Sequence, residues 1–150
     1  LKKGLEFLKP SLAATTILFL NREETALLLG VPNQTSVTEL LKGLKKLGPQ
    51  IAVITDGPNG SYCFDGQKVY FLKTFDGPVI ERTGCGDAFA TAFTAARAQG
   101  KEIVESMLWG NANSTSVIAY VGPQAGLLTE QGIQEMIAKN PSIQPVLLAE

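Results

Sequence analysis

The part of the sequence best suited to chemistry is a glycine-rich turn that leads into a run of small and apolar residues. It consists of Gly84, Cys85 and Gly86, followed by Asp87 and a predicted helix over residues 87–98. Glycines let backbone N–H groups approach a ligand, and a helix start adds unpaired donors and the positive end of the dipole. The turn is therefore predicted to bind phosphate. Asp87 would then accept a proton from a hydroxyl that attacks the phosphorus.

Each part of this turn also has a purely structural interpretation. An Asp at the start of a helix commonly serves as a plain N-cap, so Asp87 by itself is weak evidence for catalysis. Cys85 is most simply a spacer, although a thiol at a helix N-terminus is sensitive to oxidation when its pKa is lowered. Both interpretations stay open at this stage.

The segment around the turn closely resembles the C-terminal signature of the ribokinase-like, or PfkB-type, carbohydrate kinase family. Residues 81–89 read Glu-Arg-Thr-Gly-Cys-Gly-Asp-Ala-Phe, which is similar to the family's acidic residue, Thr-Gly-x-Gly-Asp and small-residue helix. The resemblance implies that Asp87 is the catalytic base. It also implies that Gly84, Cys85 and Gly86 form the anion hole for the transferred phosphate.

Three further segments resemble family elements in the expected order. Residues 21–24 resemble the Asn-x-x-Glu element, in which Glu24 would help to organise Mg²⁺ and its waters near the phosphates. Residues 55–60 resemble the Thr-x-Gly-x-x-Gly loop, and residues 111–126 resemble the helix and loop that flank the adenine. The implied nucleotide-binding residues are Asn21, Thr55, Gly57, Gly60, Asn111 and Asn113.

These segments have structural alternatives too. Asn21 could simply cap a helix, with Glu24 as a favourable acid in its first turn. Residues 55–60 could be a connecting turn, and Asn111 and Asn113 could be polar positions on a partly exposed helix.

The resemblance extends over residues 1–129 and reaches only the C-terminal portion of a family member. Residues 1–150 are accordingly expected to be the nucleotide-binding and catalytic portion of one kinase domain. The N-terminal portion, which in the family carries most sugar contacts and a strand lid, has no counterpart here, so the chain alone is expected to be inactive. Glu81 and Arg82 replace the family's common Asp-Thr beside a monovalent-cation site, which leaves potassium dependence open.

Alternation of apolar runs with helical patterns predicts an α/β fold of the three-layer α/β/α, ribokinase-like type, with a mainly parallel sheet. Expected strands cover residues 17–20 and 51–54, with a hairpin over 61–64 and 68–72. Expected helices cover residues 1–8, stopping at Pro10, and a segment carrying 26–29 that ends at Gly30. Further helices are expected from a Ser36–Glu39 capping box to Gly48, over 87–98, from about 102 towards 120, and from a Thr129 cap through 137. The tail with Pro141 and Pro145 is expected to be loose or docked in extended form.

Composition narrows the function classes. The chain has 150 residues, 45% hydrophobic and 18% charged, which suits a single globular domain. Its 13 basic and 14 acidic residues nearly cancel, so neither a nucleic acid nor a membrane is an expected partner. Lys42, Lys45 and Lys46 are interpreted as the solvated face of a helix. The absence of histidine excludes Ser-His-Asp and Cys-His catalysis, and two isolated cysteines predict reduced thiols. The first residues lack the apolar core of a secretory signal, so a cytoplasmic location is expected.

Two functions remain in consideration. One is an ATP- and Mg²⁺-dependent kinase that phosphorylates a hydroxyl group of a sugar, nucleoside or related metabolite, with homodimer formation left open. The other is a non-catalytic nucleotide-binding or assembly module derived from the same family. No Gly-x-Gly-x-x-Gly follows the first strand and no Gly-Lys-Ser/Thr is present, which argues against a dinucleotide oxidoreductase and a P-loop kinase.

Overall fold

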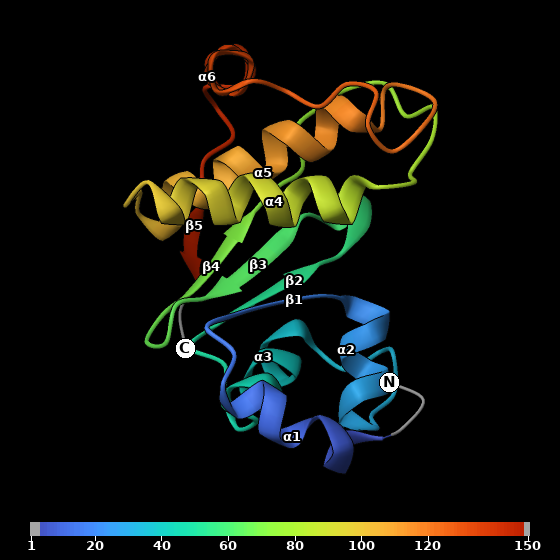
Figure 1. The fold of residues 1–150 in the computed structure, drawn as a ribbon, viewed down its shortest axis with the longest axis vertical. Coiled ribbons are helices and arrows are strands. Elements are labelled where there is room, and N and C mark those ends of the chain that lie inside the picture. Colours follow the sequence, from blue (N-terminus) through green and yellow to red (C-terminus); the bar gives the residue numbers. More distant parts are fainter. Residues whose placement is uncertain (1–3, 149–150) are drawn as a thin grey trace. The chain divides into compact units, whose positions relative to one another are not determined.

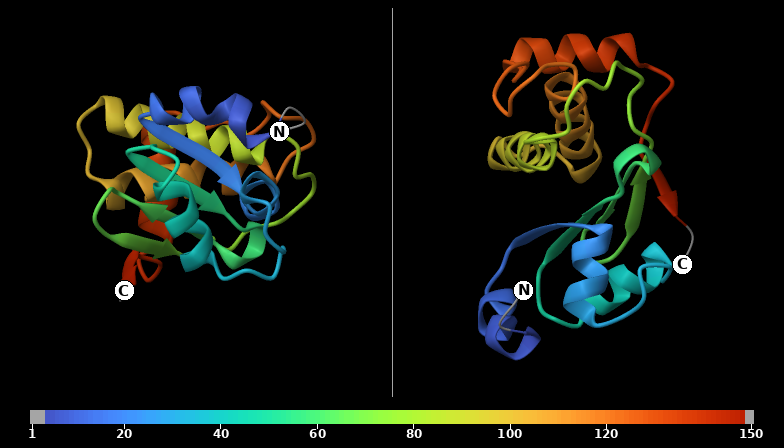
Figure 2. Two further views of the ribbon diagram at one scale, coloured as in Figure 1. Left: turned by 90° about the horizontal axis from the view of Figure 1, so that it is seen from below. Right: turned by 90° about the vertical axis from the view of Figure 1, so that its right-hand side faces the viewer.

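A computed structural model describes residues 4–148 of the chain (Figures 1 and 2). These residues group into two compact units. The first runs up to Phe71 and also includes Leu147 and Leu148, and the second is Leu72–Val146.

The strands form one five-stranded sheet with the order β1-β2-β3-β4-β5. Strand β1 pairs in parallel with β2, and β2 pairs antiparallel with β3. The bounds are Ile17–Asn21 for β1, Ile51–Thr55 for β2, Ser61–Phe64 for β3, Val69–Leu72 for β4 and Val146–Leu148 for β5. The two predicted apolar strands and the predicted hairpin are confirmed, and the end of the tail is docked in extended form as β5.

Three helices of the first unit pack against one face of its strands (Figure 1). They are α1 (Leu5–Ala13), α2 (Arg22–Leu29) and α3 (Val37–Lys45). Their apolar side chains and those of the strands form one buried cluster, whose burial from water is the main force that holds the unit together. The cluster comprises Leu12, Ala26, Leu28, Leu40, Leu41, Leu44, Ala52, Ile54 and Phe64.

Helix ends are defined by local hydrogen bonds that the sequence anticipates. The Ser36 hydroxyl accepts from the Glu39 N–H at 3.3 Å, and the Glu39 carboxylate accepts from the Ser36 N–H at 3.3 Å, which confirms the predicted capping box. Gly30 ends α2 in the left-handed conformation, with φ of 67°, as expected for a C-terminal glycine. Helix α3 ends at Lys45, three residues before the predicted stop at Gly48.

The prediction for the first helix was wrong at Pro10. Helix α1 runs through Pro10 and ends at Ala13, and residues 1–3 of the predicted span lie outside the described residues. An internal proline costs about 3 kcal/mol or more. Leu12, two residues later, is buried in the core, and full burial of such a side chain is worth about 1.5–3 kcal/mol. The cost of the proline and the gain from burying Leu12 are of similar size, so α1 can continue through Pro10.

The second unit is built on two long helices that lie against each other. They are α4 (Cys85–Ala98) and α5 (Ile103–Val117). They approach closely at Gly110, where an added Cβ would lie 2.9 Å from the Phe89 ring. Helix α5 ends at Val117, before the predicted Tyr120, because the chain then enters a turn with Gly122 at φ of 98°. Helix α6 (Glu130–Lys139) begins as predicted, with the Thr129 hydroxyl accepting from the Gly132 N–H at 3.2 Å.

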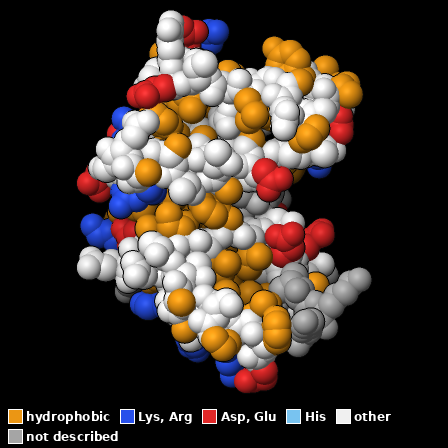
Figure 3. All heavy atoms as spheres, in the orientation of Figure 1, with side chains coloured by type: hydrophobic (Ala, Val, Ile, Leu, Met, Phe, Trp, Pro, Cys, Tyr) orange, Lys and Arg blue, Asp and Glu red, His pale blue; other side chains and the backbone are white. Residues whose placement is uncertain are grey.

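Surface charge agrees with the composition. Lys, Arg, Asp and Glu side chains are scattered among hydrophobic ones on the face drawn in Figure 3. Within residues 4–148, no helix has the length and apolar character needed to cross a membrane. Cys63 and Cys85 do not form a disulfide with each other.

Candidate functional site

The junction between β1 and α2 brings two of the predicted residues together. The Asn21 Oδ1 accepts from the Glu24 N–H at 2.7 Å, and Glu24 Oε2 accepts from the Asn21 N–H at 2.9 Å. This is a capping box, so the structural interpretation of both residues holds in full. Glu24 is exposed and retains its second carboxylate oxygen, Oε1, for a metal ion or a metal-bound water.

Thr55 lies next to this capping box because β1 and β2 run in parallel and end together. Asn21 and Thr55 are register partners at the last position of the two strands. The carboxyl ends of parallel strands are the usual place for a ligand in α/β folds. The first unit therefore brings Asn21, Glu24 and Thr55 to one edge of the sheet.

The loop after β2 is held in shape by its own backbone. The Asp56 N–H donates to the Gly60 carbonyl at 2.8 Å, and the Asn59 N–H donates to the Asp56 carbonyl at 3.0 Å. Gly57 and Gly60 have φ of 52° and 101°, values that side chains rarely allow. These glycines let the loop turn tightly, so they act through backbone shape.

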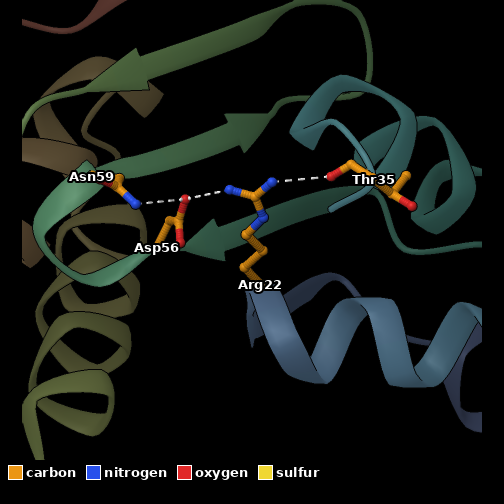
Figure 4. A network of polar contacts seen from close by, with 4 residues as sticks. All are labelled: Arg22, Thr35, Asp56 and Asn59. Carbon is orange, nitrogen blue, oxygen red and sulfur yellow. Dashed lines mark hydrogen bonds and ion pairs between the residues drawn. The ribbon is translucent and has the colours of Figure 1, made fainter. Parts of the chain in front are cut away.

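An ion pair that sequence reasoning missed links the two strand ends (Figure 4). Arg22 Nη1 donates to Asp56 Oδ2 at 3.0 Å, and Arg22 Nη2 donates to the Thr35 carbonyl at 3.2 Å. Asn59 Nδ2 donates to the same Asp56 oxygen at 3.3 Å. Arg22 and Asp56 each directly follow one of the parallel strands β1 and β2, so the sequence signal is a basic and an acidic residue close to the ends of the two predicted strands.

In the second unit, the glycine-rich turn forms the start of α4. Gly84 is the N-cap with φ of 81°, and an added Cβ there would lie 2.6 Å from the Pro123 Cβ. Only glycine fits this position. Asp87 is the third residue of the helix, so the interpretation of Asp87 as a plain N-cap was wrong.

The turn presents backbone donors beside open space. The Cys85 N–H donates to the Arg82 carbonyl at 3.3 Å, whereas the N–H groups of Gly86 and Asp87 have no backbone partner among residues 4–148. A Cβ added at Gly86 would meet nothing within 4 Å. Among the same residues the exposed Asp87 carboxylate makes no hydrogen bond or ion pair. A phosphate oxygen fits against such donors, because a helix N-terminus favours negative charge.

Glu81 fixes the approach to this turn. Its Oε2 accepts from the Gly122 N–H at 2.9 Å, while the N–H of Ile80 donates to the Ile118 carbonyl at 2.7 Å. Hydrogen bonds from the Thr83 side chain and from the Gly122 N–H lower the pKa of Glu81, and burial opposes them only in part. The carboxylate thus ties the chain before Gly84 to the loop that contains Pro123. From the sequence, Glu81 was matched to the acidic residue of the family signature, but its bond to Gly122 was not predicted.

Asn111 and Asn113 are buried and bonded to the protein backbone. Asn111 Nδ2 donates to the Lys73 carbonyl at 2.9 Å. Asn113 Nδ2 donates to the Ala88 carbonyl at 2.9 Å, and its Oδ1 accepts from the Leu128 N–H at 2.9 Å. Asn113 therefore joins α5 to the first turn of α4 and to the segment before α6, while the expectation of a partly exposed helix face does not apply.

The predicted residues thus form two groups, one in each unit. Asn21, Glu24 and the Thr55 loop lie together in the first unit. The Gly84 turn and Asp87 lie in the second unit, with Asn113 bonded to the same helical turn.

The strand-end capping box and the glycine-capped helix start both lie in the part of the sequence that matches a known family. Residues 6–130 match the pfkB family of carbohydrate kinases. The match covers most of the chain, and the chain belongs to this family.

Curated relatives carry kinase names. The chain is 29% identical to the ribokinase of Bacillus subtilis over 61% of this chain and 31% of the relative. It is 28% identical to an uncharacterized sugar kinase of Archaeoglobus fulgidus over 84% of this chain and 49% of the relative. It is 31% identical to a 5-dehydro-2-deoxygluconokinase of Clostridium beijerinckii over 78% of this chain and 35% of the relative. The chain thus spans less than half the length of each.

Solved structures confirm the α/β, ribokinase-like fold. A ribokinase of Arabidopsis thaliana complexed with ribose and ATP matches with a TM-score of 0.80 and 24% identity, over 86% of this chain and 43% of that one. A putative ribokinase II of E. coli in complex with ATP and Mg²⁺ matches with a TM-score of 0.78 and 20% identity, over 88% and 42%. At these identities the likeness establishes the fold alone.

Proposed function

We propose that the protein containing this chain is an ATP-dependent phosphotransferase that acts on a hydroxyl group of a sugar, nucleoside or related metabolite. The observation that carries the proposal is the start of α4, where the N–H groups of Gly86 and Asp87, which have no backbone partner among residues 4–148, adjoin an exposed carboxylate. Anion-binding donors and a proton acceptor within one helical turn are what phosphoryl transfer to an alcohol requires.

Asp87 is assigned the role of general base. Its carboxylate takes the proton of the acceptor hydroxyl as that oxygen forms a bond to the γ-phosphorus, while the bond between this phosphorus and the bridging oxygen of ADP breaks. The backbone N–H groups of the Gly84–Gly86 turn and of Asp87 donate to the phosphate oxygens, whose negative charge they stabilise together with the helix dipole.

The residues at the ends of β1 and β2 are assigned to the nucleotide and its metal ion. Mg²⁺ would neutralise phosphate charge, and the free oxygen of Glu24 suits it, since Mg²⁺ prefers oxygen ligands and retains several waters. Asn21 positions Glu24 through the capping box, and the Thr55 loop offers a rigid surface to the nucleotide. Glu81 is already bonded to Gly122, so a monovalent cation at that carboxylate would have to share it.

The test is phosphoryl transfer by the complete natural protein that contains this chain. It is assayed with MgATP against a panel of sugars and nucleosides, as the wild type and as Asp87→Asn. Loss of the base should lower turnover by about 10² to 10⁴. The melting temperature should change little, since an acid in the first helical turn is worth about 0.3–1 kcal/mol.

Asp76→Asn serves as the control, because Asp76 is an exposed carboxylate of the same unit. Its turnover should stay close to that of the wild type. A folded Asp87→Asn protein that transfers phosphate at a near-normal rate would contradict the assignment of the base. Binding of MgATP without phosphorylation of any acceptor would favour the non-catalytic nucleotide-binding module instead.

A further inference from the structure

A groove lies where α3, the β3–β4 hairpin and the end of β5 meet. Its volume is about 360 Å³, and all of its lining residues belong to the first unit. Leu147 and Leu148 at the end of β5 line this groove together with residues of α3. None of the residues assigned to phosphoryl transfer lines the groove, so its occupant is a separate question.

The interior of the groove is apolar. Leu41 and Phe64, which belong to the buried core, meet Val69, Leu147 and Leu148 there. Leu147 is an exposed large hydrophobic residue, with 56% of its surface accessible. A concave apolar surface of this volume lies within the range of small-molecule sites, about 300–1,000 Å³.

The rim of the groove carries lysines, and none of the described residues that line it is acidic. Lys42 and Lys45 lie one turn apart on α3, and Lys68 approaches from the hairpin. None of the three forms an ion pair within residues 4–148. The Lys45 Nζ lies 4.9 Å from the centre of the Phe64 ring, which places one charge directly beside the apolar interior. Like charges so arranged repel one another, and an anion would relieve that repulsion.

We propose that this groove binds a small amphipathic anion, with an aliphatic body among the apolar side chains and a carboxylate or phosphate head between the lysines. Lys42, Lys45 and Lys46 are exposed, which confirms the prediction of a solvated helix face, and only Lys42 and Lys45 also line the groove. A small ligand suits the enclosed volume better than a broad protein surface would.

Octanoate is the probe for the first experiment, a titration of the chain followed through its backbone amide NMR signals. The signals of Leu41, Phe64 and Val69 should move together with one dissociation constant. Octan-1-ol lacks the charge, acetate lacks the body and octylammonium reverses the charge, so each should bind at least about tenfold more weakly. Octyl phosphate, compared with octanoate, shows which anionic head the lysines prefer.

Two double variants with the same change in net charge test whether octanoate binding depends on the lysines of the groove. Lys42→Gln with Lys68→Gln removes two lysines of the rim, whereas Lys46→Gln with Lys139→Gln removes two exposed lysines elsewhere. Octanoate affinity should fall about five- to tenfold in the first variant and by less than about twofold in the second. Both should retain the wild-type melting temperature, because exposed lysines contribute little to stability.

Several results would overturn the proposal. Equal binding of octanoate and octan-1-ol would show that the lysines recognise no anion, and equal weakening in both double variants would show unspecific charge attraction. Absence of coherent shifts at Leu41, Phe64 and Val69 would show that the groove is not the site. Binding of an acidic peptide where octanoate does not bind would assign the groove to a protein partner.

Discussion

At the scale of single residues, the second unit places two carboxylates in opposite situations. Asp87 is exposed and unbonded within the described residues, which suits a group that must exchange a proton with a ligand. Glu81 accepts hydrogen bonds from Thr83 and Gly122, which suits a group that stays ionised and holds structure. The positions of Asp87 and Glu81 in the sequence do not show which of them is suited to proton exchange, since both lie within one short motif.

The lowered pKa of Glu81 leads to a prediction about how the stability of the fold depends on pH. A carboxyl group whose pKa is lower in the folded state stabilises the fold above its unfolded pKa, about 4.3 for glutamate. That contribution is lost as the pH falls through the lower, folded-state pKa. The difference in melting temperature between the wild type and Glu81→Gln should therefore be largest near pH 7 and should vanish in acid.

Thermal melts from pH 7 to pH 3 measure this difference. Glu23→Gln is the matched control, since the exposed Glu23 carboxylate makes no hydrogen bond or ion pair with residues 4–148. It should show no comparable loss of effect in acid. A Glu81→Gln difference that is independent of pH would mean that packing, and not ionisation, links Glu81 to Gly122.

At the scale of helices and strands, the sequence predicts what local patterns determine. The apolar runs at 17–20 and 51–54 give strands, and the Ser36–Glu39 pattern gives a capped helix, because each depends on neighbours in the chain. Three features depended on residues far apart. Burial of Leu12 carries α1 through Pro10, close approach of Pro123 fixes Gly84 as the N-cap, and parallel pairing joins Arg22 to Asp56.

The candidate site also has features that local sequence patterns predict and features that depend on residues far apart in the chain. The residue types and order of the site were predictable from motifs, whereas the hydrogen bonds that position them were not. Asn113 illustrates the limit, because its bonds to the Ala88 carbonyl and the Leu128 N–H require α4 and α5 to be packed. The tertiary fold brings these hydrogen-bond partners together, so no local sequence pattern predicts their contacts.

The two glycines of the turn should respond differently to alanine. Gly84→Ala forces a left-handed alanine and a 2.6 Å contact with Pro123, so we expect a loss of about 1–3 kcal/mol in the free energy of unfolding. Gly86→Ala meets nothing within 4 Å, and alanine is the better helix former by up to about 1 kcal/mol. That variant should keep or gain stability but bind ATP more weakly, because its methyl group enters the space assigned to phosphate.

Urea unfolding and ATP titration of both variants, run side by side, test this contrast. Equal destabilisation by the two alanines would mean that the turn is constrained at Gly86 as well. Unchanged ATP affinity in Gly86→Ala would argue that phosphate does not lie against this part of the helix start.

At the scale of the whole molecule, the chain is a family member of limited extent. It covers 31% to 49% of the three relatives described above and 42% to 43% of the two solved structures. The proposed site needs an acceptor held beside Asp87, and correct positioning supplies much of the rate of phosphoryl transfer, up to about 7–11 kcal/mol of the barrier. The residues proposed above are for the nucleotide and the base, and no residue is proposed for the acceptor.

We therefore expect the 150-residue chain to bind nucleotide without efficient turnover. ATP affinity should lie within about tenfold of that of the complete natural protein, because Glu24, the Thr55 loop and the α4 start are all present. Phosphoryl transfer should be at least about 10³-fold slower, since an unheld acceptor loses most of the advantage of proximity. Calorimetric ATP titration and a coupled ADP assay on both proteins measure the two quantities. Turnover by the chain close to that of the complete protein would show that these residues hold the acceptor as well, and loss of ATP binding would show that the nucleotide site itself needs residues beyond them.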